Sequence, residues 1–196
     1  MNVVVTDAPL DDMAEYGRIP IAFEVTRVLH VAARDGGLGG LVMEERAVET
    51  PWVKDYDAAG DRPARWTRHF NVSRWRMFEA RVDGRLVGGA VVAWDTPGVH
   101  MLEERRDLAV LWDIRVLPEA RGHGVGAALF RAAEAWARAL PGCRQLKIET
   151  QNINVGACRF YAAMGCELGA IQRFAYPDLP DEVQLFWYRD LTSGTT

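Results

Sequence analysis

The chain has 196 residues, of which 49% are apolar and 26% are charged, and this composition predicts one globular domain with its own hydrophobic core. Its 27 Asp and Glu residues outnumber its 23 Lys and Arg residues, so the formal net charge is -4. A general nucleic-acid binder usually carries a basic surplus, and this class is therefore disfavoured. The longest apolar run covers residues 86–94, whereas a membrane-spanning helix needs about 20 residues. We therefore expect neither a nucleic-acid nor a membrane partner.

The beginning of the chain and its cysteines indicate a reducing compartment. The first residues include acids and no Lys or Arg, which excludes the charge pattern of a secretory signal. Three cysteines (Cys143, Cys158 and Cys166) are an odd number without a close pair. This spacing argues against a disulfide framework and against a zinc site. We expect a cytoplasmic location, no metal, and a packed thiol rather than a nucleophile at Cys158.

The predicted elements begin with a helix over residues 21–31. Its apolar residues Ile21, Val25, Val28 and Leu29 follow helical spacing. The glycine cluster at residues 36–40 should end this helix in a turn. No Lys-Ser/Thr pair follows the cluster, so it does not have the context of a phosphate loop.

The middle of the chain predicts antiparallel strands. Residues 75–82 and 86–94 flank the dipeptide Asp83-Gly84, a strong signal for a two-residue hairpin. A further strand is expected over Leu108–Val116 and should end at Leu117-Pro118.

The C-terminal half predicts alternating strands and helices. A helix is expected over residues 125–140, then a strand over 146–150. A second helix should follow Asn154 and end at Gly165, with its apolar face formed by Ala157, Phe160, Tyr161 and Met164. Residues 167–171 and 183–188 fit two last strands. This order predicts an α/β (α+β) fold with a mixed, mostly antiparallel sheet flanked by helices, in a single domain over residues 1–196.

The segment most informative about function follows the strand that ends before Leu117. It contains three alternating glycines (Gly122, Gly124 and Gly126), and a helix begins there. Exposed backbone N–H groups and the helix dipole would point at one place there, which suits a pyrophosphate. Arg121 would add a charged clamp. The spacing G-x-G-x-G is not the dinucleotide fingerprint. The alternative is a helix entry whose glycines serve packing only.

Two blocks carry a family resemblance. The run Arg121-Gly-His-Gly-Val-Gly126 resembles the Arg/Gln-x-x-Gly-x-Gly/Ala signature of the GNAT acetyltransferases, which bind acetyl-CoA. The run from Asn154 to Gly165 is similar to the family's Asn-x-x-Ala-x-x-Phe-Tyr-x-x-x-Gly helix, in the order and at the separation that the family shows. Cys166 stands where the family usually has Phe or Tyr. The resemblance covers residues 75–190 well and implies the GNAT fold, an acetyl-CoA-binding core over about residues 108–166, and acetyl-CoA as co-substrate.

Within the family, three runs resemble the streptothricin acetyltransferase group: residues 112–116, residues 148–154, and Leu185-Phe-Trp-Tyr188. Residues 51–57 also resemble an early block of such proteins. The resemblance implies transfer of acetyl from acetyl-CoA to a primary amine of a small cationic molecule, with a streptothricin-type antibiotic as the named candidate. A polyamine, an amino-acid derivative or a protein N-terminus is the alternative acceptor, and a CoA-binding sensor without turnover is the alternative from another class. A homodimer is an expectation at the level of the family only.

By resemblance, the backbone of Ile114, Arg115 and Val116 would hold the pantetheine arm and the acetyl carbonyl, whose developing charge an N–H near Val116 would stabilise. The pyrophosphate would lie against Arg121, Gly122, His123, Gly124, Val125, Gly126 and Ala127. Asn154 would bond to the CoA arm, or serve as a helix N-cap, or do both. Tyr161 matches the family's general acid, which protonates the departing thiolate; the alternative is a buried aromatic.

The general base is open between two carboxylates. A substrate amine with a pKa near 10 is neutral in only about one molecule in a thousand at pH 7, so a proton acceptor is needed. Asp113 and Glu149 lie close in sequence to the two CoA-binding blocks, and either one could face the cleft. The alternative for each is a solvated or salt-bridged carboxylate. Acids at Glu103, Glu104, Asp107 and residues 178–182 could form a rim for a cationic substrate, although a solvated loop is favoured.

Overall fold

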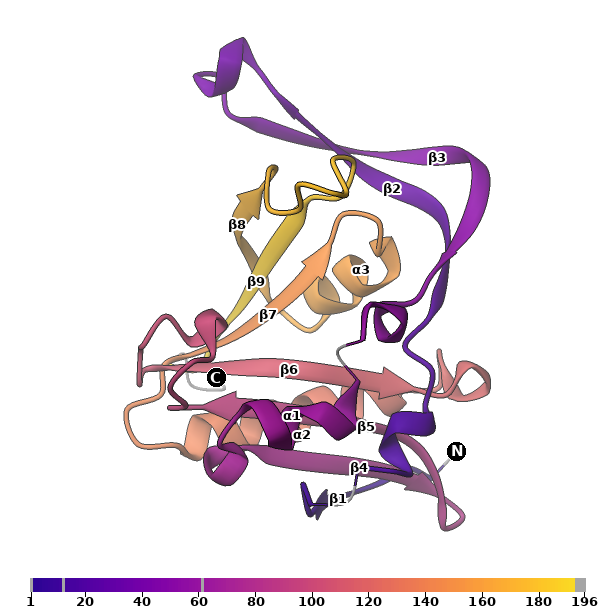
Figure 1. Cartoon of the computed structure of the whole chain (residues 1–196), viewed down its shortest axis with the longest axis vertical. Helices are drawn as coiled ribbons and strands as arrows, with labels where there is room; N and C mark the ends of the chain where they lie inside the picture. The colour runs from indigo at the N-terminus through magenta and orange to yellow at the C-terminus, as the bar shows by residue number, and fades with distance from the viewer. Residues whose placement is uncertain (1, 12, 61, 193–196) are drawn as a thin grey trace. The chain divides into compact units, whose positions relative to one another are not determined.

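The computed structural model describes residues 2–11, 13–60 and 62–192 and has a mixed α/β fold. Its strands and α-helices are β1 (Val4–Ala8), β2 (Phe23–Ala33), β3 (Leu41–Lys54), α1 (Pro63–His69), β4 (Arg76–Val82), β5 (Arg85–Trp94), β6 (Leu108–Val116), α2 (Val125–Ala139), β7 (Gln145–Gln151), α3 (Val155–Ala163), β8 (Glu167–Gln172) and β9 (Gln184–Asp190) (Figure 1). In the described ranges, seven strands follow the order β1-β4-β5-β6-β7-β9-β8, and β2 pairs with β3 separately. This agrees with the mixed, mostly antiparallel sheet expected from the sequence.

The chain divides into two compact units. The first comprises Met1–Ile21, Tyr56–Ile148 and Arg189–Thr196, and the second comprises Ala22–Asp55 and Glu149–Tyr188. Strand β7 begins in the first unit and ends in the second. The single domain over residues 1–196 stays a prediction.

The first unit is built on the antiparallel strands β1, β4, β5 and β6. The beginning of β7 runs parallel to β6, with Leu108 opposite Gln145 and Leu111 opposite Ile148. Helix α2 packs against β4, β5 and β6. A hydrophobic core cluster of this unit contains buried residues of β4, β5 and β6 together with Tyr16, Trp66 and Trp75.

Two adjacent glycines on β5 show how closely both faces of these strands are covered. A Cβ atom on Gly88 would lie 3.1 Å from side-chain carbons of Val125 and Leu129 in α2. A Cβ atom on Gly89 would lie 2.6 Å from the ring of Tyr16. Successive residues of a strand face opposite sides, so β5 admits no side chain toward either neighbour at this point.

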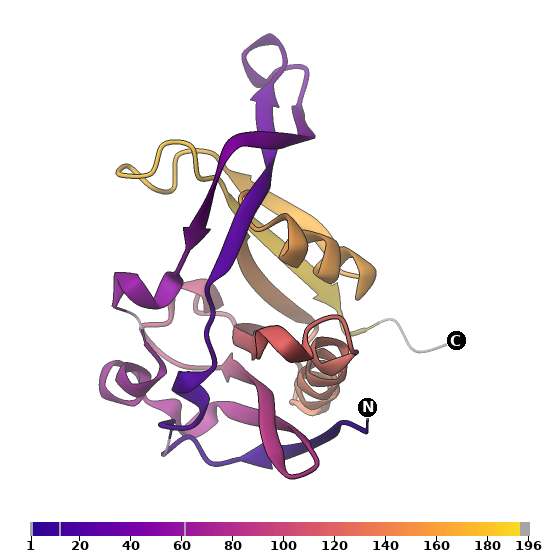
Figure 2. The same cartoon turned by 90° about the vertical axis from the view of Figure 1, so that its right-hand side faces the viewer.

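The second unit contains the long β2–β3 ribbon, helix α3, and the antiparallel pair β8 and β9. Figure 2 shows this ribbon extending to its turn. The turn contains Gly36 (φ 65°), Gly37 (φ 108°) and Gly40 (φ 82°), a left-handed backbone region that favours glycine. The turn expected from the glycine cluster is therefore confirmed.

The helix predicted over residues 21–31 is wrong, because these residues form strand β2. They pair with β3 from Phe23 opposite Lys54 to Ala33 opposite Leu41. The segment is rich in β-branched residues, which favour strands, and a bulge between Val25 and Arg27 breaks the regular alternation that reveals a strand. The helical spacing of the four apolar residues in this segment was therefore misleading.

The other predicted elements are confirmed within one or two residues at their ends. Asp83 (φ 50°) and Gly84 (φ 80°) form the expected turn between β4 and β5, β6 has the expected bounds, and Gly165 (φ 77°) follows α3. The apolar face expected on α3 needs a correction. Its buried residues are Val155, Cys158 and Tyr161, whereas Phe160 and Met164 are only partly buried.

A membrane-spanning helix was not expected, and the described part of the chain contains none that is long and apolar enough to cross a bilayer.

The contact between Gly89 and Tyr16 predicts a stability change. We expect Gly89→Ala to lower the free energy of unfolding by about 1–3 kcal/mol, because the new methyl group overpacks the site. Gly156→Ala is the matched control: Gly156 lies on α3, and its added Cβ would meet nothing nearer than the Asn154 Oδ1 atom at 3.9 Å. This control should be neutral or stabilising by up to about 1 kcal/mol. Urea unfolding of both variants measures the difference, and equal midpoints would contradict the packing argument.

Candidate active site

The loop after β6 leaves the beginning of α2 open. Arg121, Gly122, His123 and Gly124 are all exposed, and Gly122 (φ 75°) and Gly124 (φ 85°) adopt the left-handed conformation. Gly124 is the N-cap residue of α2 and makes no side-chain capping bond. A Cβ atom on Gly122 or Gly124 would meet nothing within 4 Å. The space beside Gly122 and Gly124 is thus open next to the end of α2 whose first N–H groups have no partner within the helix, an arrangement that suits an anion.

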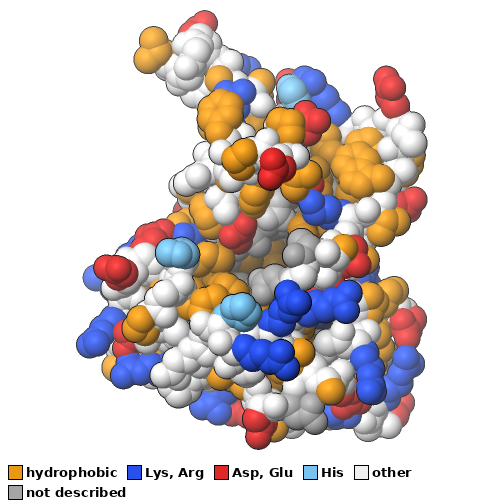
Figure 3. Space-filling model, viewed as in Figure 1, with side chains coloured by type: hydrophobic (Ala, Val, Ile, Leu, Met, Phe, Trp, Pro, Cys, Tyr) orange, Lys and Arg blue, Asp and Glu red, His pale blue; other side chains and the backbone are white. Residues whose placement is uncertain are grey.

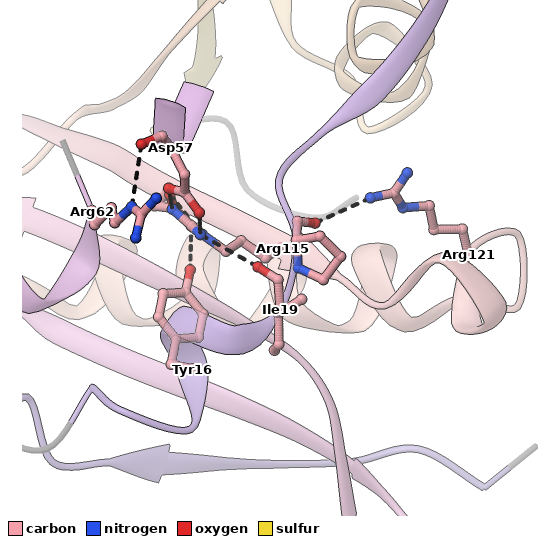
Figure 4. Close-up of polar contacts among 8 residues, drawn as sticks. Tyr16, Ile19, Asp57, Arg62, Arg115 and Arg121 are labelled. Carbon is pink, nitrogen blue, oxygen red and sulfur yellow. Dashed lines mark hydrogen bonds and ion pairs between the residues drawn. The ribbon is translucent and has the colours of Figure 1, made fainter. Parts of the chain in front are cut away.

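Arg121 is bound to the backbone beside this loop (Figure 4). Its Nε atom donates to the carbonyl oxygen of Val116 (3.0 Å), and its Nη2 atom donates to that of Pro20 (3.3 Å). The Nδ1 atom of His123 lies 2.8 Å from the Arg121 carbonyl oxygen. These contacts give the loop a defined shape, while the pyrophosphate contacts of Arg121 and residues 122–127 stay predictions.

Along the end of β6, side chains alternate between the two faces of the strand. Ile114 and Val116 are partly exposed, whereas Asp113 and Arg115 are buried on the other face. The backbone of residues 114–116 pairs with Gly88, Gly89 and Ala90 of β5. The expected contacts of this backbone with the acetyl donor stay predictions.

Arg115 is the centre of a buried charge cluster in the first unit. Its guanidinium group donates to both oxygens of Asp113 (2.9–3.1 Å) and to both oxygens of Asp57 (2.7 and 2.9 Å). It also donates to the carbonyl oxygen of Ile19 (3.3 Å). The Tyr16 hydroxyl donates to Asp113, and Figure 4 shows Tyr16, Ile19 and Asp57 arranged around Arg115. We refer to Tyr16, Asp57, Asp113 and Arg115 as the Arg115 cluster.

Burial and neighbouring charges both shift the pKa values of the residues in the Arg115 cluster. Burial raises the pKa of Asp113, although Arg115 opposes this shift. Burial and the Asp113 charge raise the pKa of Tyr16, so its hydroxyl remains a proton donor. Burial lowers the pKa of Arg115, but Asp113 and Asp57 raise it more, and the net shift is upward. The ion pair with Arg115 (2.9 Å) agrees with the alternative of a salt-bridged carboxylate at Asp113, and its role as a general base stays a prediction.

In the second unit, the residues of the Asn154–Gly165 block hold structural positions. The Asn154 Oδ1 atom accepts a hydrogen bond from the Ala157 N–H group (3.1 Å), so Asn154 is the N-cap of α3. Tyr161 is 5% exposed, and its ring centroid lies 5.3 Å from that of Phe160. These positions agree with the structural alternatives; the roles of Asn154 toward CoA and of Tyr161 as an acid stay predictions.

Cys158 lies on the buried face of α3. Its side chain is near the Gln151 carbonyl oxygen (Sγ to O, 3.8 Å), and burial raises the pKa of its thiol to about 12. The thiolate is the nucleophilic form of cysteine, and it is scarce here at neutral pH. The packed-thiol interpretation is supported.

Glu149 is partly buried on β7 and has two hydrogen-bond donors. The Tyr176 hydroxyl donates to its Oε1 atom (2.7 Å), and the Gln151 Nε2 atom reaches the same oxygen at 3.3 Å. In contrast to Asp113, Glu149 has no ion pair among the described residues.

Three of the six acids that were considered for a substrate rim form ion pairs. Glu103 pairs with Lys147 (2.6 Å), Asp107 with Arg105 (2.9 Å), and Glu182 with Lys54 (2.5 Å). The hydrogen bond from Lys147 also lowers the pKa of Glu103. Figure 3 shows side chains of both charges on the face in view. Within the described ranges, no group of three or more His, Cys, Asp or Glu residues could hold a metal.

The sequence does not single out four members of these clusters: Tyr16, Asp57, Gln151 and Tyr176. Asp57 and Gln151 had a signal, because residues 51–57 and 148–154 resemble blocks of streptothricin acetyltransferases. Contacts such as Arg115–Asp57 join residues 58 positions apart, and spacing along the chain does not reveal them.

With this geometry in place, comparison with known proteins gives the class. Residues 41–166 match the model of the acetyltransferase (GNAT) family. The chain belongs to this family, whose members use acetyl-CoA, and the family resemblance is confirmed.

The relatives narrow the resemblance to one group. The streptothricin acetyltransferase of Escherichia coli is 41% identical over 154 residues, which cover 76% of each chain. Streptothricin acetyltransferase A of Bacillus subtilis (strain 168) is 40% identical over 82 residues, which cover 41% of this chain and 47% of that protein. The chain thus matches about half the length of the Bacillus relative.

Two solved structures share the fold over nearly their whole length. The crystal structure of nourseothricin acetyltransferase has a TM-score of 0.75 at 25% identity. A protein of Bacillus anthracis str. Ames described as a streptothricin acetyltransferase, solved with acetyl coenzyme A, has a TM-score of 0.74 at 24% identity. Each comparison covers 97% of this chain and 99% of the other.

The Arg115 cluster predicts a large stability effect. Arg115→Met would leave Asp57 and Asp113 together without their cation, so we expect a loss of about 3–5 kcal/mol of unfolding free energy. Arg85→Met is the control, because Arg85 pairs with Glu119 at the surface, where ion pairs contribute little. Urea unfolding measures both, and a midpoint for Arg115→Met equal to that of Arg85→Met would contradict the central role of Arg115.

Proposed function

We propose that this protein transfers an acetyl group from acetyl-CoA to a primary amine of a small cationic acceptor, with a streptothricin-type antibiotic as the first candidate. The observation that carries the proposal is the exposed, unblocked glycine loop at the beginning of α2, in a chain of the GNAT family. The identity to the Escherichia coli streptothricin acetyltransferase supports the choice of acceptor.

Binding of acetyl-CoA is assigned to the loop and to the end of β6. The pyrophosphate is negatively charged, and the free N–H groups of the first turn of α2, together with the helix dipole, favour an anion there. Gly122 and Gly124 have open space where a side chain would stand, so the backbone can approach phosphate oxygens closely. The backbone of residues 114–116 is assigned to the pantetheine arm and the acetyl carbonyl.

The proposed reaction is a direct transfer. The neutral amine attacks the acetyl carbonyl carbon, the C–N bond forms, and the C–S bond breaks. Before this attack the amine, which is protonated at neutral pH, gives one proton to the general base. The departing thiolate takes a proton from Tyr161, and the second proton that the nitrogen loses after the attack restores the Tyr161 hydroxyl, so protons and charges balance. The raised pKa of Cys158 supports direct transfer, because an acetyl-cysteine intermediate would need a thiolate.

We assign the general base to Glu149 rather than to Asp113. Both oxygens of Asp113 are bound by the buried Arg115, so a proton arriving there would have to break an ion pair. The two hydrogen bonds of Glu149 both reach Oε1, which leaves Oε2 for the amine or for a bridging water. A base must lie within hydrogen-bond reach of the proton it accepts, directly or through one water.

The function is tested by thiol release from acetyl-CoA against a panel of amines. The panel contains streptothricin, a polyamine, an amino-acid amide and a peptide with a free N-terminus, and acetyl-CoA affinity is measured alongside. We expect turnover to be fastest with streptothricin. A preference for another amine would change the proposed acceptor but leave the proposed reaction intact. Tight CoA binding without turnover would favour a sensor and contradict the proposal.

The assignment of the pyrophosphate site predicts the effect of one substitution. Gly124→Glu should abolish acetyl-CoA binding, because its side chain would fill the open space and repel the phosphates. Gly142→Glu is the matched control: Gly142 (φ 74°) lies beyond the other end of α2 and also has open space around an added Cβ. Calorimetric titration should show wild-type affinity for this control, so equal affinities of the two variants would contradict the assignment.

A further inference from the structure

Tyr176 connects the segment between β8 and β9 to the carboxylate of Glu149. Its hydroxyl donates to the Glu149 Oε1 atom (2.7 Å) and accepts a hydrogen bond from the Gln151 Nε2 atom (2.8 Å). Gln151 also reaches Glu149 Oε1 at 3.3 Å. The three side chains thus form a closed triangle of hydrogen bonds within the second unit.

Hydrogen bonds and an ion pair hold the C-terminal part of the segment between β8 and β9, which contains Tyr176. Asn152, which is 4% exposed, donates its backbone N–H to the Val183 carbonyl oxygen (3.0 Å) and accepts the Val183 N–H at Oδ1 (2.8 Å). Its Nδ2 atom donates to the Asp181 carbonyl oxygen (3.3 Å). The ion pair between Lys54 and Glu182 (2.5 Å) holds the same stretch to β3.

Hydrogen bonds within turns of the segment connect the anchored residues 181–183 to Tyr176. The Leu179 N–H donates to the Tyr176 carbonyl oxygen (3.0 Å), and the Glu182 N–H donates to the Leu179 carbonyl oxygen (2.9 Å). A continuous path of hydrogen bonds therefore leads from the buried Asn152 to the backbone of Tyr176. The Tyr176 hydroxyl therefore extends from a backbone that is itself held by hydrogen bonds. This is expected of a residue that fixes the orientation of another side chain.

A proton acceptor works well when its free oxygen has one orientation. A glutamate side chain loses considerable rotamer freedom when it is ordered, and two donors on Oε1 restrict the orientation of the carboxylate plane. Among the described residues, Oε2 accepts no hydrogen bond, so it is the oxygen left for a proton. Charge-assisted hydrogen bonds of this kind are about twice as strong as neutral ones.

We propose that Tyr176 is a positioning residue for acetyl transfer: it holds Glu149 so that Oε2 accepts the proton of the amine. The inference rests on the proposed function and deepens it, because it assigns a catalytic use to the segment between β8 and β9. Tyr176 touches neither reacting group and acts through Glu149.

A double-mutant cycle tests this relation. Glu149→Gln should lower kcat by about 100-fold or more, and Tyr176→Phe by about 10- to 100-fold, with the KM for acetyl-CoA unchanged in both. If Tyr176 acts through Glu149, the double variant should be no slower than Glu149→Gln alone. Additive losses, or a change confined to the KM for the amine, would overturn the positioning role.

The pH dependence supplies a readout that a general structural defect would not produce. The fraction of neutral amine rises about tenfold per pH unit until the amine's own pKa near 10, so the need for a base falls. The deficit of Tyr176→Phe relative to wild type should therefore shrink as the assay pH rises from 7 to 9. A deficit that stays constant over this range would contradict the inference.

Tyr188→Phe is the matched control, because it removes one tyrosine hydroxyl from the same unit on β9. It should keep the wild-type kcat. Failure of the two proposals is distinguishable: absence of turnover by the wild-type protein with every amine overturns the proposed function and the inference together. Turnover by the wild type with an equal kcat for Tyr176→Phe overturns the inference alone.

Discussion

The buried guanidinium group of Arg115 is the interaction on which the first unit depends. It lies between two carboxylates, Asp57 and Asp113, and also binds the carbonyl oxygen of Ile19. Burying either carboxylate without this cation would be costly, so three chain segments are obliged to meet at the end of β6. The same strand leads directly into the glycine loop. A charge requirement in the core thereby defines the position of the backbone to which donor binding is assigned.

The second unit uses neutral hydrogen bonds for a comparable purpose. Asn152 joins β7 to the segment before β9 through its backbone and its side chain, and its Nδ2 atom also donates to the Leu29 carbonyl oxygen on β2 (3.0 Å). One buried amide therefore connects three parts of this unit. The buried amide of Asn152 thus has a role in the second unit like that of the buried Arg115 in the first, and the ion pair of Lys54 with Glu182 adds to it.

Local patterns in the sequence predicted most elements of the fold, and the limits have physical causes. Strand β6, the Asp83-Gly84 turn and α2 depend on neighbouring residues, and they were found. Strand β2 depends on pairing with β3 and carries a bulge, so its apolar spacing imitated a helix. The glycine loop was recognisable because its chemistry lies in consecutive residues. Tyr176 was not, because it meets Glu149 across 27 positions and only the folded chain brings the two together.

The capping bond of Asn154 limits what this residue can offer to a ligand. Its side-chain oxygen already accepts from the Ala157 N–H group and keeps one lone pair, whereas both amide hydrogens can be donated to acceptor atoms of a ligand. Aspartate would cap the helix equally well and would gain from the helix dipole. It would, however, supply no donor and would add a negative charge to a protein that, on the proposed function, binds a polyanion. Asparagine combines the cap with neutrality.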